Sequence, residues 1–224
     1  MRYGCGVEPR TTSALPGPHA GVIAGGKVFV VDDDKGFLRS MDRLLRTTGC
    51  EVRTFTSARE FLAADRGEGA SCLLLDLRMP GVGGIELQEK LVASGQDIPI
   101  IFLSGHAEFE SGVAAMRAGA IDFLSKPFTE AELLAAVAKA LDQDRRSRAA
   151  RASRGDALVR LARLTPRERQ VCDLVATGLL NKQIAAELGA AEKTIKCHRG
   201  RVMEKLEVGS VAELVRLVDL ARKP

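Results

Sequence analysis

The chain has 224 residues, 46% of them hydrophobic and 28% charged, with a formal net charge of +4, which allows one large domain or two small ones with ordinary globular cores. No apolar run approaches the roughly 20 residues of a membrane-spanning helix, so we expect no membrane partner. The five cysteines are odd in number, widely spaced and without a Cys-x-x-Cys pair, which argues against a disulfide framework and favours reduced thiols in the cytoplasm.

The chain begins with a segment, 1–26, that holds three prolines and no continuous apolar stretch, so we expect a disordered tail rather than a secretory signal. From residue 27, short apolar runs alternate with stretches whose apolar residues lie three and four apart, as in amphipathic helices. The apolar runs are 27–31, 52–55, 72–75, 99–103 and 121–124. Two helix starts carry capping boxes, Ser57 with Glu60 and Thr129 with Glu132. This alternation predicts an α/β domain over 27–141, with a five-stranded parallel, doubly wound (flavodoxin-like) sheet covered by helices on both faces.

Polar residues follow the predicted strands where the strands end. Three aspartates, Asp32 to Asp34, follow the first strand in "VFVVDDDKG", and Asp76 follows the third. Ser104 ends the fourth strand and Lys126 follows the fifth. Because the carboxyl ends of parallel strands meet at one edge of the sheet, we expect these side chains to converge there. Two carboxylates suit Mg²⁺, a carboxylate can attack a phosphoryl group, and an ammonium can neutralise phosphoryl oxygens.

This set, completed by Pro127 after Lys126, resembles the receiver domain of two-component response regulators over about 27–144. The resemblance implies that Asp76 is the phosphoacceptor and that the Lys126–Pro127 bond is cis. It implies Mg²⁺ held by Asp33, Asp76 and the backbone carbonyl of Arg78, with Asp32 acting through water. It also implies a phosphate-sensing switch made of Ser104, Lys126 and Phe123. We interpret Asp34 as a first-turn helix charge without a required role.

Two other classes of protein share part of this pattern. The start "VVDDD" also resembles phosphatases of the haloacid-dehalogenase type, but Gly36 stands where that pattern has Thr or Val, and no cap insertion is evident. A flavodoxin-like nucleotide binder needs a phosphate-cradling loop after the first strand, where three aspartates would repel a phosphate unless a metal intervened.

Charge divides the chain into an acidic and a basic part. Residues 27–144 hold 13 Lys and Arg against 19 Asp and Glu, whereas residues 145–224 hold 18 against 9, which suggests a polyanionic partner for the basic part. Between the two, segment 142–157 has five arginines and few apolar residues. It predicts a linker, with a partial continuation of the preceding helix as the alternative.

Only helical patterns follow, over 158–224. Thr165, Pro166 and Glu168 form a capping box at a helix start, and two further helices flank Gly189, as in a helix-turn-helix. In the second of these, which begins near Glu192, a helical projection divides the side chains between two faces. One face carries Ile195, His198, Arg199, Val202 and Leu206. The other carries Lys193, Lys196, Cys197, Gly200, Arg201 and Glu204 and suits a DNA major groove.

The stretches "LTPRE", "NKQIAAEL" and "KTIKCHRGRVMEKL" resemble a LuxR-type helix-turn-helix, the output module of the FixJ/NarL subfamily, over about 160–221. The resemblance implies that a last helix, 211–220, dimerises. It implies base reading by the early part of the second helix, where we favour Lys196, and we favour phosphate contacts for Arg201 and Lys205. The expected DNA-binding residues are Thr165, Asn181, Lys182, Lys193, Thr194, Lys196, Cys197, Gly200, Arg201 and Lys205.

Together these features predict a cytoplasmic, phosphorylation-controlled, DNA-binding transcription regulator that is not an enzyme. Its expected partners are a sensor histidine kinase, double-stranded DNA, a second copy of the chain after phosphorylation and, as a further candidate, RNA polymerase. One alternative keeps the DNA binding but uses the receiver as an unphosphorylated scaffold. A distant alternative is a Mg²⁺-dependent phosphohydrolase.

Overall fold

The computed structural model describes residues 23–105, 116–117 and 119–222. The chain divides into two compact units, Met1–Arg146 and Ser147–Pro224. Within the described residues, no helix combines the length and apolar character that crossing a membrane requires.

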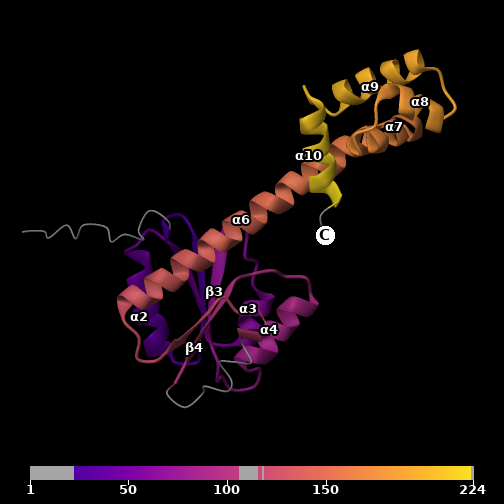
Figure 1. Cartoon of the computed structure of the whole chain (residues 1–224). Helices are drawn as coiled ribbons and strands as arrows, with labels where there is room; N and C mark the ends of the chain where they lie inside the picture. Colours follow the sequence, from indigo (N-terminus) through magenta and orange to yellow (C-terminus); the bar gives the residue numbers. More distant parts are fainter. Residues whose placement is uncertain (1–22, 106–115, 118, 223–224) are drawn as a thin grey trace, which may run out of the picture. The chain divides into compact units, whose positions relative to one another are not determined.

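Within the described residues, the first unit is built on a parallel sheet of five strands in the order β2-β1-β3-β4-β5. Figure 1 labels two of them, β3 and β4, in this unit. The strands are β1 (Lys27–Val31), β2 (Glu51–Phe55), β3 (Ser71–Asp76), β4 (Ile100–Ser104) and β5 (Asp122–Ser125). All five predicted strands are present, with ends shifted by at most one residue. The strand order reverses direction beside β1, which makes the edge after β1 and β3 the topological switch point of a doubly wound fold. The predicted fold class is confirmed.

Helices cover both faces of this sheet, which is why β1 is a continuous apolar run. Side chains alternate along the strand, so Val28 and Val30 enter one core cluster while Phe29 and Val31 enter the other. The first cluster is completed by α2 (Lys35–Arg46) and α6 (Glu130–Ala162), and the second by α3 (Ala58–Ala63) and α4 (Gly84–Ala93). The helix expected between the fourth and fifth predicted strands falls largely on 106–115, outside the described residues.

Both capping predictions can be compared with hydrogen bonds. At α6 the box is complete, because Glu132 N–H donates to the Thr129 hydroxyl and the Glu132 carboxylate accepts from Thr129 N–H. At α3 Ser57 accepts from Glu60 N–H, but the Glu60 carboxylate accepts from Thr56 rather than from Ser57. At α3 the backbone N–H that donates to the Glu60 carboxylate therefore belongs to the residue before the N-cap, so the predicted capping box is only half formed.

The last residues of the predicted tail, 23–26, belong to the described part of the structure. Residues 1–22 lie outside the described part, but Ile23 is fully buried in the cluster that holds Val28 and Leu141. Gly25 N–H donates to the carbonyl of Gly49, and an added Cβ at Gly26 would lie 2.5 Å from a methyl carbon of Leu141. The prediction of disorder was therefore wrong for 23–26, because Ile23 covers an apolar surface that a sequence pattern of prolines and glycines does not reveal.

Helix α6 continues through the whole predicted linker, 142–157. No proline interrupts it, and ion pairs four residues apart support its exposed surface, as in Arg146–Asp142 at 2.7 Å and Arg160–Asp156 at 2.8 Å. Asp144, which is buried, accepts a hydrogen bond of 2.8 Å from the backbone N–H of Ser71 at the start of β3. The segment after residue 141 thus still contacts the sheet.

In the described part of the second unit, the end of α6 is followed by four further helices, α7 (Pro166–Ala176), α8 (Asn181–Glu187), α9 (Glu192–Lys205) and α10 (Val211–Arg222). Their apolar sides form one core, to which α9 contributes Ile195 and Val202. Thr165 caps α7 with the complete capping box that the sequence predicts. The Gly-containing turn between α8 and α9 gives the predicted helix-turn-helix.

Candidate functional site

The predicted strand-end residues meet at the carboxyl edge of the sheet. The ammonium of Lys126 donates to Asp32 Oδ2 at 2.6 Å and to Asp76 Oδ1 at 2.7 Å, joining the loop after β5 to the ends of β1 and β3. The side chain of Asp32 is only 2% exposed and that of Asp76 13%. Two carboxylates and one ammonium are therefore held together in a mostly buried position.

The environment changes the acidity of both charge types. Burial raises the pKa of Asp76, against the opposing effect of its hydrogen bond from Lys126. Burial alone would lower the pKa of Lys126, but hydrogen bonds to Asp32 and Asp76 outweigh it and raise that pKa. Lys126 therefore stays an ammonium at neutral pH. The second oxygen of Asp76 accepts from Arg78 N–H at 2.9 Å, which fixes the carboxylate plane.

The three consecutive aspartates have three different environments. Asp32 is buried and accepts from Asp34 N–H at 2.8 Å, while Asp33 is exposed. Asp34 is the N-cap of α2 and accepts from Gly36 N–H at 2.7 Å and Phe37 N–H at 3.2 Å. The hydrogen bond from Phe37 N–H lowers the pKa of Asp34 most, and that from Gly36 N–H lowers it further. Asp34 thus lies just before the helix, as its cap, and not in the first turn as predicted.

The predicted switch residues lie on β4 and β5. Ser104 is buried, and its hydroxyl donates to the carbonyl of Gly105 at 3.0 Å. Phe123 is half-buried and packs against the core cluster that contains Phe102, its partner in the β4–β5 register. The Lys126–Pro127 peptide bond is cis, as the resemblance implied.

Sequence reasoning missed two residues beside this site. The ring of Phe37 has its centroid 4.1 Å from the ammonium nitrogen of Lys126, within the range of a cation–π contact. Gly84 begins α4 where an added Cβ would lie 2.5 Å from the carbonyl oxygen of Asp76 and 3.0 Å from the Phe102 ring. For the close contact between Gly84 and Asp76, the signal in the sequence was Gly84 itself, the third glycine of "GVGGIEL".

The donor set suits Mg²⁺ better than a softer metal. Within the described residues, no group of three His, Cys, Asp or Glu side chains is arranged to hold a metal ion. Mg²⁺, however, uses one or two protein carboxylates and retains several waters. Asp32 and Asp76 already direct two carboxylate oxygens at one cation, the Lys126 ammonium, and exposed Asp33 follows Asp32 in the sequence.

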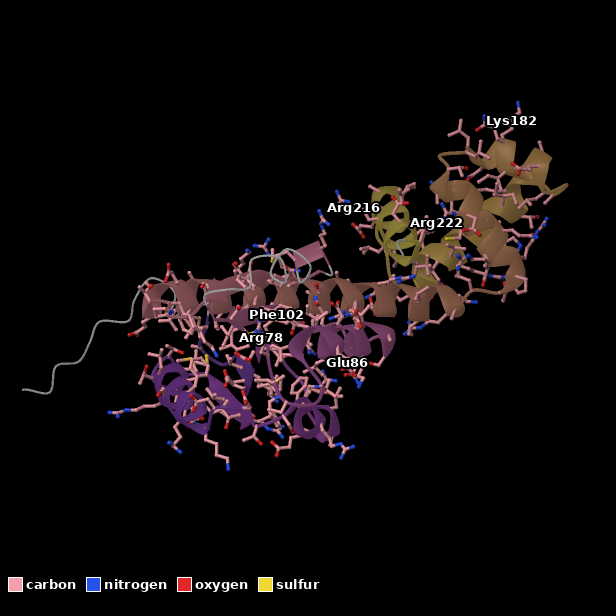
Figure 2. The ribbon with its side chains drawn as sticks, turned by 90° about the horizontal axis from the view of Figure 1, so that it is seen from below. Arg78, Glu86, Phe102, Lys182, Arg216 and Arg222 are labelled. Atoms are coloured by element: carbon pink, nitrogen blue, oxygen red, sulfur yellow. The ribbon has the colours of Figure 1, made fainter. Side chains whose placement is uncertain are left out.

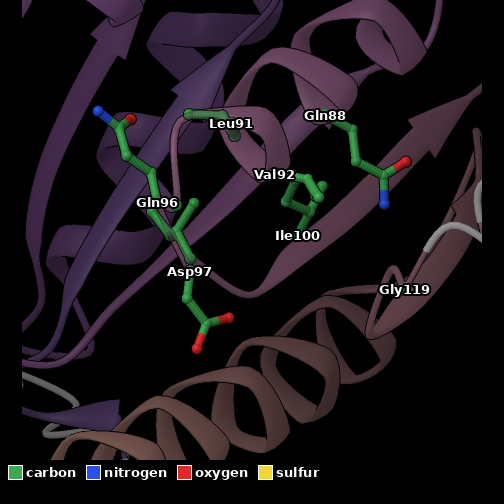
Figure 3. A pocket seen from close by; sticks show the side chains of 9 residues that line it. Gln88, Leu91, Val92, Gln96, Asp97, Ile100 and Gly119 are labelled. Atoms are coloured by element: carbon green, nitrogen blue, oxygen red, sulfur yellow. The ribbon is translucent and has the colours of Figure 1, made fainter.

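A pocket of about 220 Å³ lies elsewhere on the first unit (Figure 3). Leu91 and Val92 of α4 and Ile100 at the start of β4 line it. Since Ile100 begins the strand that Ser104 ends, this pocket lies at the amino edge of the sheet, opposite Asp76. It is not part of the site described above.

The helical projection of α9 is confirmed by burial. Ile195, Val202 and Leu206 are buried, and His198 and Arg199 are half-buried. The opposite face is exposed along Lys193, Lys196, Cys197, Gly200, Arg201 and Glu204, and Thr194 is exposed as well. An added Cβ at Gly200 would meet nothing within 4 Å. This face offers cations and hydrogen-bond donors to a polyanion.

Helix α8 and the start of α7 contribute the other predicted contact residues. Lys182 projects outward from α8 (Figure 2) and is exposed. Asn181 accepts a 3.0 Å hydrogen bond from Arg199, which ties the start of α8 to the middle of α9. Thr165 is exposed, and its hydroxyl caps α7.

Lys205, a predicted phosphate contact, also has a partner inside the unit. Its ammonium donates to Glu168 Oε2 at 2.7 Å, and the Glu168 carboxylate is also the acceptor in the α7 capping box. The hydrogen bond from Lys205, followed by that from Thr165 N–H, lowers the pKa of Glu168 to about 2. Lys205 therefore links α9 to α7 inside the unit, and its side chain remains 37% exposed, so its predicted phosphate contact stays a prediction.

Comparisons with known proteins cover both units. Residues 28–138 match the family model of the response regulator receiver domain, and residues 162–218 match that of bacterial regulatory proteins of the luxR family. Nodulation protein W of Bradyrhizobium diazoefficiens is 46% identical over 203 residues, 91% of this chain and 89% of that protein. Transcriptional regulatory protein FixJ of the same organism is 40% identical over 192 residues, 86% of this chain and 94% of that protein. The solved structure of the response regulator StyR is 48% identical, covers 88% of this chain and 99% of that chain, and superposes with a TM-score of 0.78.

Proposed function

The chain belongs to the two-component response regulator transcription factors of the FixJ/LuxR type, and we propose that Asp76 is the residue through which phosphorylation controls it. The family consists of transcription regulators rather than enzymes, so the phosphohydrolase alternative is excluded. The observation that carries the proposal is the pair of hydrogen bonds from Lys126 to Asp32 and Asp76.

In the proposed reaction, a carboxylate oxygen of Asp76 attacks the phosphorus of a phosphohistidine on a sensor histidine kinase. An O–P bond forms, the N–P bond breaks, and the imidazole leaves with the electron pair of that bond. Lys126 lies 2.7 Å from Asp76 Oδ1 and so donates to the oxygens of the arriving group. The orienting bond from Arg78 N–H to Asp76 Oδ2 leaves Oδ1 facing the ammonium side of the site.

Asp33, Asp76 and the backbone carbonyl of Arg78 are the proposed ligands of Mg²⁺, with Asp32 acting through water. Their oxygen atoms suit this hard cation. When bound, Mg²⁺ supplies positive charge that offsets the negative charge of phosphoryl oxygens.

The aspartyl phosphate adds a charge of about −1.5 to −2 beside Lys126 and Ser104. We infer that the Ser104 hydroxyl leaves the Gly105 carbonyl to donate to a phosphoryl oxygen, and that half-buried Phe123 moves with it. Such a switch requires a differential binding energy of a few kcal/mol. Its output in this proposal is a homodimer that binds double-stranded DNA through the exposed face of α9 and recruits RNA polymerase.

The test is labelling by acetyl phosphate with Mg²⁺. The wild-type chain should accumulate an acid-stable, base-labile phosphoprotein, and Asp76→Asn, which keeps the side-chain shape, should not. Continued labelling of Asp76→Asn would show that the acceptor is another residue.

A second candidate function is a constitutive DNA-binding regulator with an unphosphorylated receiver. The ion pairs of Lys126, which compensate Asp32 and Asp76 without a phosphoryl group, are compatible with this function as well but do not favour it over phosphorylation. The same experiment separates the two, because a scaffold would remain unlabelled while still binding its operator.

A further inference from the structure

Phe37 contacts the charged centre of the site without being charged itself. An ammonium has three N–H donors, and Lys126 uses two of them for Asp32 and Asp76. The Phe37 ring lies over the same nitrogen at 4.1 Å from its centroid. The negative face of an aromatic ring attracts a cation at this distance.

The ring is fixed in its position from two sides. Phe37 N–H donates to Asp34 Oδ1 at 3.2 Å, so the residue is tied to the acidic loop. Phe128, which follows the cis proline, packs edge-on against the ring with an interplanar angle of 85° and centroids 6.2 Å apart. Lys126 is thus confined between two carboxylates and an immobilised ring.

These contacts also link Asp32, Asp34, Phe37 and Lys126 into one cyclic network. Asp32 accepts from Asp34 N–H through one oxygen and from Lys126 through the other. Asp34 accepts from Phe37 N–H, and the Phe37 ring returns to Lys126. A displacement of the ring therefore changes the position of the ammonium relative to Asp76.

We propose that Phe37 is a positioning residue for phosphoryl transfer, whose ring holds the Lys126 ammonium between Asp32 and Asp76. This inference rests on the proposed role of Asp76 as the phosphoacceptor. A lysine side chain has four flexible carbons, so without a contact on its outer side the ammonium samples positions from which it cannot reach the phosphoryl oxygens. The half-buried ring also keeps water from one side of the ammonium, which strengthens its interaction with the transferred group.

The test compares side chains at position 37 in the full chain, labelled by acetyl phosphate. Phe37→Leu keeps an apolar side chain but removes the aromatic face, and its initial rate at saturating Mg²⁺ should fall about fivefold, equivalent to roughly 1 kcal/mol. Phe37→Trp and Phe37→Tyr restore an aromatic face, and at least one should recover most of the rate. The Mg²⁺ concentration for half-maximal rate should stay unchanged, because the ring acts on the ammonium and not on the proposed ligands.

The control is Phe61→Leu, the same substitution in the core cluster on the other face of the sheet. Phe61 is fully buried against Phe29 and Phe55. The melting temperature of this variant should therefore fall, while its initial rate of labelling should stay unchanged. An unchanged rate in Phe37→Leu would overturn the inference, and so would a loss that neither aromatic variant restores. If the wild-type chain itself is not labelled, the proposed acceptor fails, and the role of Phe37 fails with it.

Discussion

Replacing Gly84 by alanine tests whether the backbone of β3 and the start of α4 fit together as tightly as the structure indicates. The new methyl carbon would lie 2.5 Å from the Asp76 carbonyl oxygen, where ordinary contact begins near 3.4 Å. The oxygen belongs to the backbone and cannot rotate away. Either α4 must move outward by about 0.9 Å, or the end of β3 that carries Asp76 must tilt.

Overpacking of this kind costs about 1–3 kcal/mol, and the higher helix propensity of alanine returns up to about 1 kcal/mol. The difference spans about 0–3 kcal/mol, and we expect a net destabilisation near its middle, about 1–2 kcal/mol. For a domain of this size, that corresponds to a fall in melting temperature of roughly 3–8 °C. Because the strained atom belongs to Asp76 itself, the initial rate of phosphorylation should fall as well.

The assay is differential scanning calorimetry of the full chain together with acetyl phosphate labelling. Gly83→Ala is the matched control, because an added Cβ there would meet only the Leu77 carbonyl at an ordinary 3.7 Å, and φ is −73°. As an N-cap change it should cost about 0.5 kcal/mol. Equal melting temperatures of the two variants would refute the close approach of α4 to β3.

The other predictions concern the metal ligands and the helical domain. Asp33→Ala should weaken Mg²⁺ binding in titration calorimetry, and an unchanged affinity would remove Asp33 from the ligand set. Lys196→Ala should cost about 1–3 kcal/mol on the operator and reduce the ratio of specific to random affinity, whereas Lys205→Ala should leave that ratio unchanged. The pKa of Glu168 lies at about 2, below its ordinary 4.5, so its contribution to stability is complete above pH 4.5 and is lost as pH falls toward 2. Glu168→Gln should flatten the melting temperature against pH across that window, and an unaltered slope would contradict the ion pair with Lys205.

The sheet and the arrangement of its polar edge could be predicted because each depends on local pattern plus a general rule. Continuous apolar runs such as 28–31 occur in strands buried on both faces. Residues that follow such strands then meet at one edge whatever the details of packing, which brought Asp32, Asp76 and Lys126 together. The burial of α9 followed in the same way from helical periodicity.

The remaining contacts join residues that are distant in sequence, and no local pattern encodes them. From the sequence alone, Lys205 cannot be told apart from the exposed Arg201 of the same helix. Glu168 is 37 residues away in the sequence, and only the fold brings its carboxylate within 2.7 Å of the Lys205 ammonium. Nothing in the residues around Phe37 indicates its contact with Lys126, because that contact depends on a loop almost ninety residues later. The burial of Ile23 in the core could not be predicted either, because the rest of segment 1–26 has the composition of a disordered tail.

The hydrogen bond between Asp144 and Ser71 bears on how such regulators exchange their output modules during evolution. A recombination that joined a foreign output module after residue 141, where the alternation of strands and helices ends, would delete the carboxylate that accepts from the buried Ser71 N–H. An unsatisfied buried donor costs about 1–3 kcal/mol, a large share of the stability of a small domain. Viable crossovers should therefore fall beyond Asp144, so that the first turns of the joining helix are inherited with the receiver.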